Sequence, residues 1–475
     1  MRITSRHTLA GVIVSAASLV AAVSTASMAA ATTPTQPAPT PTGEAITITV
    51  TTNAISGGKN GAEADYFTTW VKPEFEKAMA AQGKNVTLTF EPNGVDDENY
   101  KTKQALDLKT GKGADLIGID GIWYGEFADA GYIKPLDDLV GADVVNAWSG
   151  WAQIQPAVQA LSSYNGKRYG IPSGTDGRVI YFNKEIFKAA GLPTDWQPTS
   201  WDDILTAART IKEKTDAIPL QWNAGSSMGE ATTMQGLLPL LAGTGAQVFA
   251  DGKWLGGSKQ LVDVLSFYAT VYGSEQLGDP ILQQEAQGRD RSFEQFSKGE
   301  IAILAEGDYF WRSVISPKEG DFAMANRDEV VGYAKIPAMK PGAGINGQDF
   351  VSMSGGGGFV INPNSGHPQE TWQLMAFLSE ADAIKARLDG SARVTARDDV
   401  NVEVLGKDPL LSFIAKEVLP ITAYRPAFAV YPQVSAALQE ATDAILTGTS
   451  PADAAAAYQT KVSDLVGADK VATAS

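Results

Sequence analysis

Short runs of β-branched residues alternate along this chain with longer amphipathic stretches, and this alternation limits the folds that the chain can adopt. The runs 46–50 and 86–90 flank a stretch whose apolar residues recur at three- and four-residue steps, and the run 114–120 follows a second such stretch. Two parallel strands need a long crossover between them, which is usually a helix. The order β-α-β-α-β therefore predicts a largely parallel sheet covered by helices on both faces.

The same kinds of element recur further along the chain. Ser200 precedes a stretch over 201–215 with apolar residues on one face, and Asp203 stands three residues after Ser200, which is typical of a capped helix. Sheet-forming patterns before and after about residue 170 predict an α/β fold of two lobes with a cleft between them. We also expect helices at 259–273, 292–299, 368–379, 409–418 and 433–446, and short buried strands at 301–304 and 359–361.

The amino terminus has the three-part pattern of a secretory signal peptide, which we place at 1–31. Two arginines precede an apolar run over 9–23, and small residues follow with alanines at the A-x-A spacing that suits signal peptidase. The apolar run is shorter than the ~20 residues that a membrane-spanning helix needs. Residues 32–43 are rich in Pro and Thr, which predicts a semi-extended linker.

Composition excludes several classes of function. The chain of 475 residues has 38 Lys+Arg against 54 Asp+Glu, a net charge of −16, which argues against nucleic acid as a partner because such binders need clustered positive charge. The absence of Cys and the presence of only 2 His remove thiolate chemistry and leave little for a transition-metal site. We expect no metal and no cofactor. Carboxylates, hydroxyls, amides and aromatic faces remain, and these suit sugar recognition.

Two hydrolase hypotheses stay open as alternatives. The segment 225–229 fits the G-x-S-x-G elbow of serine esterases, with Ser227 as nucleophile, but after signal removal the one histidine left is His367, just before an expected helix. A secreted glycosidase needs two carboxyl groups across a cleft, which a sequence alone does not exclude. The glycine pattern in 341–347 lacks the strand and helix that a dinucleotide fingerprint requires. We expect a protein that is not an enzyme.

Aromatic and short polar residues gather in glycine-rich loops. Sugars have C–H faces that stack on rings, and hydroxyl rims that bind carboxylates, amides and guanidinium groups. Simple packing in the core is the alternative for each ring. The candidates that these loops supply are Trp123, Tyr124, Asp176, Arg178, Trp222, Tyr309 and Trp311.

An ordered series of motifs over nearly the whole mature chain resembles the extracellular solute-binding proteins of ABC importers, in particular the carbohydrate-binding group that includes the maltodextrin-binding proteins. The segments that carry the resemblance include ADLIGIDGIWYGEF at the start of 114–139, YGIPSGTDGRVIYFN within 164–192 and EGDYFW at the end of 292–311. The others are 199–211, 355–380 and 424–454.

The resemblance implies a type II periplasmic-binding-protein fold with ligand held between two α/β lobes. It places an N-terminal lobe at 44–174 and 355–405 and a C-terminal lobe at 175–354 and 406–470. It also implies roles for particular residues. Asp176 would contact a sugar hydroxyl with Arg178 nearby, Asp120, Trp123 and Tyr124 would line the N-terminal lobe, and Gly356 and Gly357 would belong to the second crossing between lobes. Trp222, Tyr309, Trp311, Phe428 and Tyr431 would supply further contacts.

The resemblance further implies capture of a mono- or oligosaccharide by hinge closure and delivery to the permease subunits of an ABC transporter. We expect a monomer that is secreted, in the periplasm or at the outer face of the cytoplasmic membrane. The sequence differs from lipoprotein members in having no Cys that could be acylated. A non-sugar ligand bound by the same fold is the remaining alternative.

Overall fold

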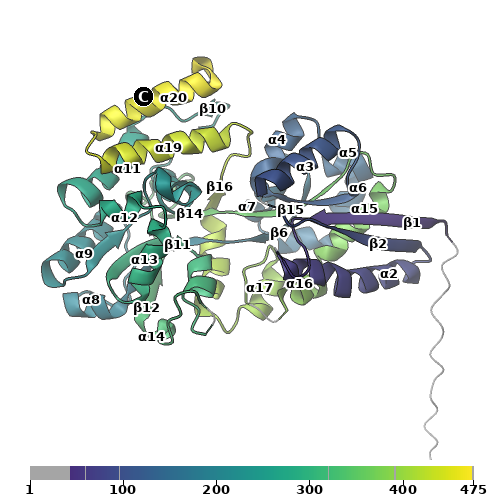
Figure 1. Ribbon diagram of the computed structural model, residues 1–475, viewed down its shortest axis with the longest axis horizontal. Helices are drawn as coiled ribbons and strands as arrows, with labels where there is room; N and C mark the ends of the chain where they lie inside the picture. Colours follow the sequence, from purple (N-terminus) through teal and green to yellow (C-terminus); the bar gives the residue numbers. More distant parts are fainter. Residues whose placement is uncertain (1–42, 59, 96, 319, 390–391, 473–475) are drawn as a thin grey trace, which may run out of the picture. The chain divides into compact units, whose positions relative to one another are not determined.

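The computed structural model describes residues 43–472 except 59, 96, 319 and 390–391 (Figure 1). The predicted signal peptide lies outside the described residues, and so does the predicted linker apart from Gly43. Among the residues that are described, no helix is both long and apolar enough to cross a membrane.

A five-stranded sheet with the order β2-β1-β3-β15-β6 contains the three strands expected near the amino terminus. β1 pairs in parallel with β2 and β3, whereas β15 runs antiparallel to both β3 and β6. The strands at 46–50, 86–90, 114–120 and 359–361 are thus confirmed within their observed bounds. These bounds are Ala45–Thr52 for β1, Asn85–Pro92 for β2, Leu116–Asp120 for β3, Gly170–Thr175 for β6 and Gly356–Ile361 for β15.

Helices cover both faces of this sheet, as the side chains of β15 show. Phe359 belongs to a buried cluster with Phe75 of α2 (Lys72–Ala81) and Trp372 of α15 (Pro368–Leu378). Val360, the next residue, belongs to a separate buried cluster with Tyr100 of α3 (Asp97–Lys109). Successive strand residues point to opposite faces, so these two clusters lie on the two sides of the sheet.

A four-stranded sheet with the order β12-β7-β11-β8 forms the second lobe's centre. β11 is parallel to β8 and antiparallel to β7, so this sheet is mixed. Ile303 and Ala305 of β11 lie in the same buried cluster as Ile204 of helix α9 (Trp201–Lys214). The strands are β7 (Arg178–Asn183), β8 (Ile218–Gln221), β11 (Ile301–Gly307) and β12 (Val331–Ala334), and β11 contains the strand expected at 301–304.

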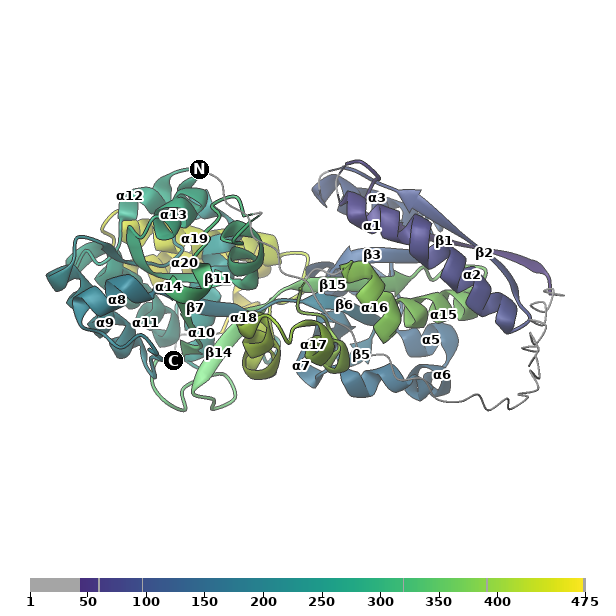
Figure 2. The ribbon, with the colours of Figure 1, turned by 90° about the horizontal axis from the view of Figure 1, so that it is seen from below.

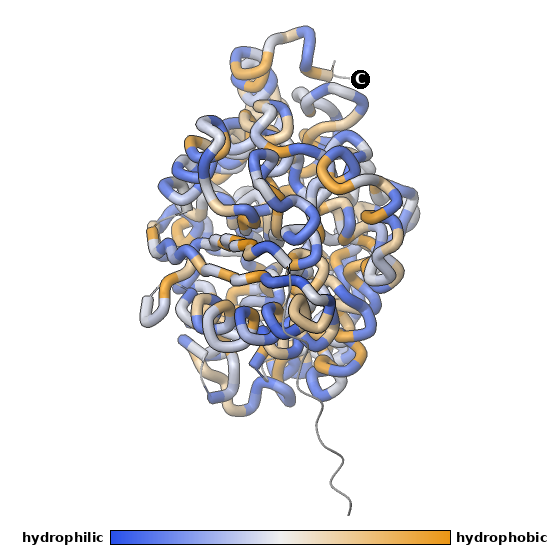
Figure 3. Tube along the Cα trace, turned by 90° about the vertical axis from the view of Figure 1, so that its right-hand side faces the viewer, coloured by the Kyte–Doolittle hydropathy of each residue, from blue (hydrophilic) through white to orange (hydrophobic). Residues whose placement is uncertain are grey.

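The helices expected in the second half form close to their expected ranges. Figure 3 shows hydrophilic and hydrophobic residues interspersed along the trace. The amphipathic pattern is borne out by burial: in the helix at 201–214, Ile204, Ala207, Ala208 and Ile211 are buried at three- and four-residue steps. The stretches at 259–273 and 409–418 continue from an α-helix into a wider π-helical turn. The observed α-helices are α9 (Trp201–Lys214), α11 (Lys259–Tyr268), α13 (Gly288–Ser297), α15 (Pro368–Leu378), α18 (Pro409–Phe413), α19 (Tyr431–Leu446) and α20 (Pro451–Val466).

Two short connections lead from the five-stranded sheet to strands of the second lobe, and they run side by side (Figures 1 and 2). β6 leads through residues 176–177 into β7, and β14 (Phe350–Ser354) leads through Gly355 into β15. β14 pairs with β13 (Ile336–Pro337) and β16 (Thr422–Tyr424) in a separate three-stranded sheet. The hydroxyl of Thr175 donates to the Gly355 carbonyl at 3.2 Å, which joins the two connections. This arrangement gives the α/β fold of two lobes that the alternating pattern predicts, while the residue limits of the lobes stay a prediction.

The cap of α9 provides a test of how much a local signal stabilises this fold. The Ser200 hydroxyl accepts a hydrogen bond from the Asp203 N–H at 3.2 Å. Ser200→Ala removes this acceptor, and we expect it to lower the free energy of unfolding by about 1 kcal/mol in urea titrations. Thr206→Ala, at an exposed position of the same helix, is the matched control and should not destabilise. Equal stabilities of the two variants would contradict a capping role for Ser200.

Candidate functional site

A polar cavity of about 1060 Å³ lies where β1, β3 and β6 end and β15 begins. The carboxyl ends of strands in open α/β sheets are the usual place for ligands. Of the candidates from the sequence, Asp120, Trp123, Asp176, Gly356 and Gly357 line this cavity. The wall also includes residues that sequence reasoning missed: Asn53, Glu63, Arg312, Arg387, Asp389 and Arg393.

Asp176 is a fixed carboxylate on the cavity wall. It forms an ion pair with the Arg178 guanidinium and accepts a hydrogen bond from the Gly355 N–H at 2.6 Å. Burial alone would raise its pKa, but Arg178, the Gly355 N–H and the charge of Arg425 together hold the pKa below its usual value. Asp176 therefore stays ionised at neutral pH and can accept hydrogen bonds from hydroxyl groups.

Arg178 positions Asp176 from behind and is itself buried. Its Nε donates to Oε1 of Gln235 at 2.9 Å, and its backbone N–H donates to the Ser352 hydroxyl at 3.0 Å. With a side chain only 8% exposed, Arg178 is not among the residues that line the polar cavity. The prediction that it lies near the Asp176 site agrees with its position, and its contacts are those of a supporting residue.

Asp120 and Trp123 follow β3 in a short 3₁₀ turn (Gly121–Trp123). The Asp120 carboxylate accepts from the Ile122 N–H at 3.0 Å, which orients this exposed side chain at the end of the strand. The Trp123 ring packs against Tyr100 and Phe127, with centroids 6.2 Å from each, and is largely buried although it lines the cavity. A carboxyl group and an aromatic ring thus lie together at the end of one strand.

Gly356 and Gly357 allow β15 to lie close to its neighbours at the cavity wall. A Cβ at Gly356, whose φ is 133°, would lie 2.3 Å from the Gly174 carbonyl oxygen. A Cβ at Gly357 would lie 2.4 Å from the carbonyl oxygen of Ile119. Both glycines are therefore required by strand packing, and as a consequence they present bare backbone to the cavity.

Asp308 is a buried carboxylate close to Arg312. Its side chain is 1% exposed, and neither of its carboxylate oxygens has a hydrogen-bond partner among the described residues. The Arg312 Nε lies 3.5 Å from Oδ1. Burial first, and then the charge of Asp176, raise the pKa of Asp308 to about 6. The sequence analysis selected the motif EGDYFW for its aromatic residues. In the structure, the charged residues Asp308 and Arg312 determine the electrostatic character of this segment.

Tyr309 and Trp311 take different positions in the turn after β11. The Tyr309 ring is 43% exposed, and the Arg312 guanidinium lies 5.6 Å from its centroid, although the ring does not line the polar cavity. The Trp311 ring is buried, since its Nε1 donates to Asp408 at 3.0 Å and the Arg327 guanidinium stacks 3.7 Å from its centroid. Trp311 is therefore a packing residue in this structure.

Three further candidate rings lie in the core instead of at the cavity. Trp222 is fully buried, packs on Phe267 and donates from Nε1 to the Gly236 carbonyl at 3.0 Å. Tyr124 is fully buried behind β15, and the Tyr431 hydroxyl donates to Glu230 at 2.7 Å. An aromatic ring in a loop can turn toward a cavity or toward the core, and all three of these rings turn toward the core.

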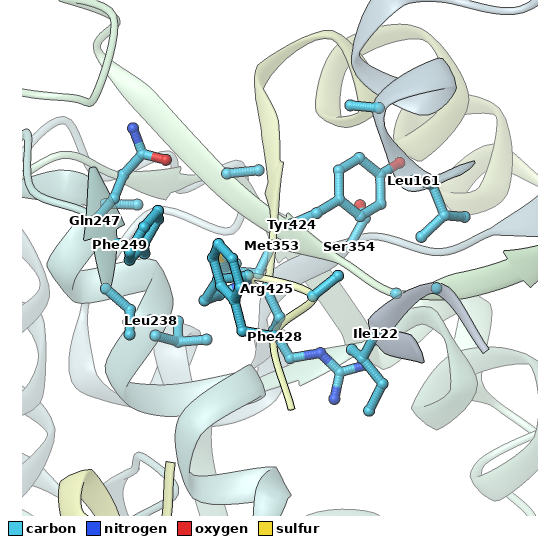
Figure 4. A pocket seen from close by; sticks show the side chains of 18 of the residues that line it. Ile122, Leu161, Leu238, Gln247, Phe249, Met353, Ser354, Tyr424, Arg425 and Phe428 are labelled. Carbon is cyan, nitrogen blue, oxygen red and sulfur yellow. The ribbon is translucent and has the colours of Figure 1, made fainter. Parts of the chain in front are cut away.

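A second pocket, of about 290 Å³, shares Asp120 and Gly356 with the polar cavity and contains Phe428 (Figure 4). Phe428 packs on Phe249 with centroids 4.5 Å apart. The Arg425 guanidinium extends toward Ile122 in Figure 4 and forms an ion pair with Glu230 at 3.1 Å. Phe428 thus lines this second pocket and is not among the residues that line the cavity beside Asp176.

The esterase hypothesis receives no support from the surroundings of Ser227. Its hydroxyl donates to the Gln284 carbonyl at 2.8 Å, and the contacts of the described residues bring no histidine to it. His367 precedes α15, where its N–H donates to the Ser365 hydroxyl. Within the described part of the chain, no group of three or more His, Cys, Asp or Glu residues is placed to hold a metal ion.

Comparison with known proteins gives a family match and similar folds. Residues 58–385 match the family described as bacterial extracellular solute-binding protein. A putative binding protein of Brucella abortus is 30% identical over 139 residues, 29% of this chain and 31% of that protein. A maltooligosaccharide ABC transporter solute-binding lipoprotein of Streptococcus pneumoniae is 25% identical over 54% of this chain and 56% of its own length. The matched segments thus span less than two thirds of these relatives.

Solved structures show the same fold at low sequence identity. The cyclic α-maltosyl-1,6-maltose binding protein of Arthrobacter globiformis has a TM-score of 0.68 at 18% identity, covering 89% of this chain and 100% of that one. An ABC transporter solute-binding protein of Thermotoga lettingae bound with α-D-tagatose has a TM-score of 0.63 at 24% identity, with the same coverage of the two chains. At these identities the likeness establishes the fold.

Because the pKa of Asp308 is raised in the folded protein, ionisation of this carboxyl group should lower the free energy of unfolding at high pH. Its pKa in the folded protein is about 6, above the value near 4 of an unfolded chain, so ionisation opposes folding as the pH rises through this window. Asp308→Asn cannot ionise. At pH 7.5 we expect the variant to have a higher unfolding temperature than the parent, because its free energy of unfolding should be larger by up to about 2–3 kcal/mol. At pH 4 we expect this difference in stability to disappear.

The control for Asp308→Asn is Asp202→Asn, because the Asp202 side chain is 83% exposed. Thermal unfolding of the parent and both variants between pH 4 and pH 8 measures the effect. A difference between Asp308→Asn and the parent that stays constant over this range would show that Asp308 does not titrate there.

Proposed function

This chain belongs to the bacterial extracellular solute-binding protein family, and from that premise we propose that it is the extracytoplasmic substrate-binding component of an ABC sugar importer. In this role it captures a mono- or oligosaccharide and delivers it to membrane permease subunits. The proposal also follows the names of relatives, one of which is a maltooligosaccharide-binding lipoprotein. Binding and release, without a covalent step, are sufficient for such a role.

The observation that carries the proposal is the composition of the polar cavity beside the two connections between the lobes. The ionised carboxylate of Asp176, the carboxyl group of Asp120, the bare backbone of Gly356 and the Trp123 ring all line the same space. A sugar offers many hydroxyl groups and weakly polar C–H faces, so carboxyl groups and an aromatic ring complement both parts of its surface. At about 1060 Å³ the cavity has room for more than one sugar ring.

Hinge motion at the two connections is the mechanism that we propose for capture. Residues 176–177 and Gly355 join the five-stranded sheet directly to strands of the second lobe, and Asp176 itself lies in one of these connections. A ligand that touches Asp176 and residues of both lobes would favour the conformation in which all these contacts form at once. The permease would then recognise that conformation.

Replacement of Asp176 tests the sugar site. Asp176→Asn keeps an acceptor for the Gly355 N–H but removes the charge, and a hydrogen bond to a charged group contributes about 1.5–3 kcal/mol. We expect at least a tenfold loss of sugar affinity in calorimetric titrations, together with loss of sugar-induced thermal stabilisation. The ligand for these titrations is the sugar that gives the largest shift in a thermal and Trp-fluorescence screen of mono- and oligosaccharides.

Asp202→Asn is the matched control and should bind the sugar as the parent does. Because Asp176 pairs with the buried Arg178, the unliganded variant is expected to melt at a lower temperature than the parent, so affinity and not melting temperature is the deciding measurement. A screen in which no saccharide binds, while peptides or polyamines do, would overturn the sugar importer and leave the family assignment intact.

A further inference from the structure

Three arginines from separate parts of the chain line the polar cavity. Arg312 lies in the helical turn Phe310–Val314 after β11, Arg387 lies in α16 (Ala381–Leu388), and Arg393 follows that helix. None of the three belongs to a motif that a sequence analysis would select. Their convergence on one wall is a product of the fold.

These three positive charges are not equally neutralised. The Arg387 guanidinium forms an ion pair with Glu63 at 3.0 Å. Arg312 faces Asp308 at 3.5 Å, but its Nε is buried without a hydrogen-bond partner among the described residues. Arg393 makes no side-chain hydrogen bond or ion pair within the described part of the chain, although it lies exposed on the cavity wall.

The arginines also act on one another. Desolvation, followed by the charges of Arg312 and Arg387, lowers the pKa of Arg393, and the carboxylates of Asp308 and Asp176 oppose this effect less strongly. Like charges held near each other in a partly dehydrated space repel, and an anion between them relieves the repulsion. The guanidinium group presents a planar fork of donors that matches the oxygens of a carboxylate or a phosphate.

The cavity wall also carries four acidic residues beside its three arginines: Glu63, Asp120, Asp176 and Asp389. Asp176 is already paired with Arg178, and Glu63 is already paired with Arg387. Asp120 lies at the end of β3, where the charge of Arg425 acts with it, and Asp389 ends α16. The charges that act on Arg393 are those of Arg312, Arg387, the buried Asp308 and the partly exposed Asp176, so Arg393 is a cation on the wall without an ion pair among the described residues.

We infer that the saccharide taken by this cavity is acidic, and that Arg312 and Arg393 bind its anionic group while Asp176 accepts its hydroxyls. The inference rests on the proposed function and narrows its substrate class. The shared chemistry is an anion on a sugar, which a uronic acid supplies as a carboxylate and a sugar phosphate supplies as a phosphate. Neutral maltooligosaccharides, which the name of one relative specifies, lack such a group.

The test compares sugars that differ only in the anionic group. Isothermal titration of the full mature chain with glucose, glucuronate and glucose 6-phosphate, with galactose and galacturonate, and with the corresponding neutral and acidic disaccharides measures the preference. We expect an acidic member to bind at least tenfold more tightly than its neutral counterpart, and this preference to shrink as NaCl is raised from 50 to 500 mM. The carboxylate and phosphate members of each set distinguish the two sources of the anion.

Substitutions of Arg393 test whether this residue causes the preference for acidic over neutral sugars. Arg393→Gln should remove most of the preference for the acidic member over its neutral counterpart, and Arg393→Lys should restore part of that preference. Arg209→Gln is the control, since that arginine pairs with Glu275 on the surface. Circular dichroism and thermal melting of each variant confirm folding before titration.

Two results would overturn the inference without touching the proposed function: a neutral sugar that binds at least as tightly as its acidic counterpart, or an acidic preference that Arg393→Gln and Arg312→Gln both leave unchanged. Absence of binding by every saccharide, neutral and acidic, would instead contradict the proposed sugar importer. The two failures are therefore distinguishable in the same set of titrations.

Discussion

The ion pair between Asp176 and Arg178 is the interaction on which the arrangement of this protein depends. It lies in the connection from β6 to β7, and the same carboxylate accepts the N–H of Gly355 in the connection from β14 to β15. The Ser354 hydroxyl also donates to the Asp176 carbonyl, and the Arg178 N–H donates to Ser352. One charged pair thus links the connection from β6 to β7 with the connection from β14 to β15.

A buried charge pair contributes little net stability but strongly specifies geometry, because each partner is costly if the other is lost. Here the pair has a third role, since the Asp176 carboxylate is 31% exposed and lines the polar cavity. The carboxylate that joins the two connections is therefore also exposed to the cavity. In the hinge mechanism that we propose, a ligand bound to Asp176 would contact a connection between the lobes directly and could favour one lobe arrangement over another.

Charged residues of both signs reach the cavity from distant parts of the chain. Asp120, Asp176 and glycine backbone lie around the ends of β3 and β6 and the start of β15, whereas the arginines come from the turn after β11 and from the segment around α16, which also contributes Asp389. The aromatic rings contribute little to this wall. Trp222, Tyr124 and Tyr431 are packed in the core, and Trp123, which lines the cavity, is itself largely buried.

The sequence alone determined the alternation of strands and helices, the cap of α9 and the two-lobed α/β architecture, because hydrophobic periodicity and capping are local properties of the chain. Asp120 and Asp176, which the family resemblance predicted as ligand contacts, lie at the ends of β3 and β6 on the cavity wall. Only the tertiary structure decided which rings face solvent, and it alone brought Arg387 and Arg393 to a cavity that begins at β1. Such choices depend on contacts between segments hundreds of residues apart, and no local pattern records them.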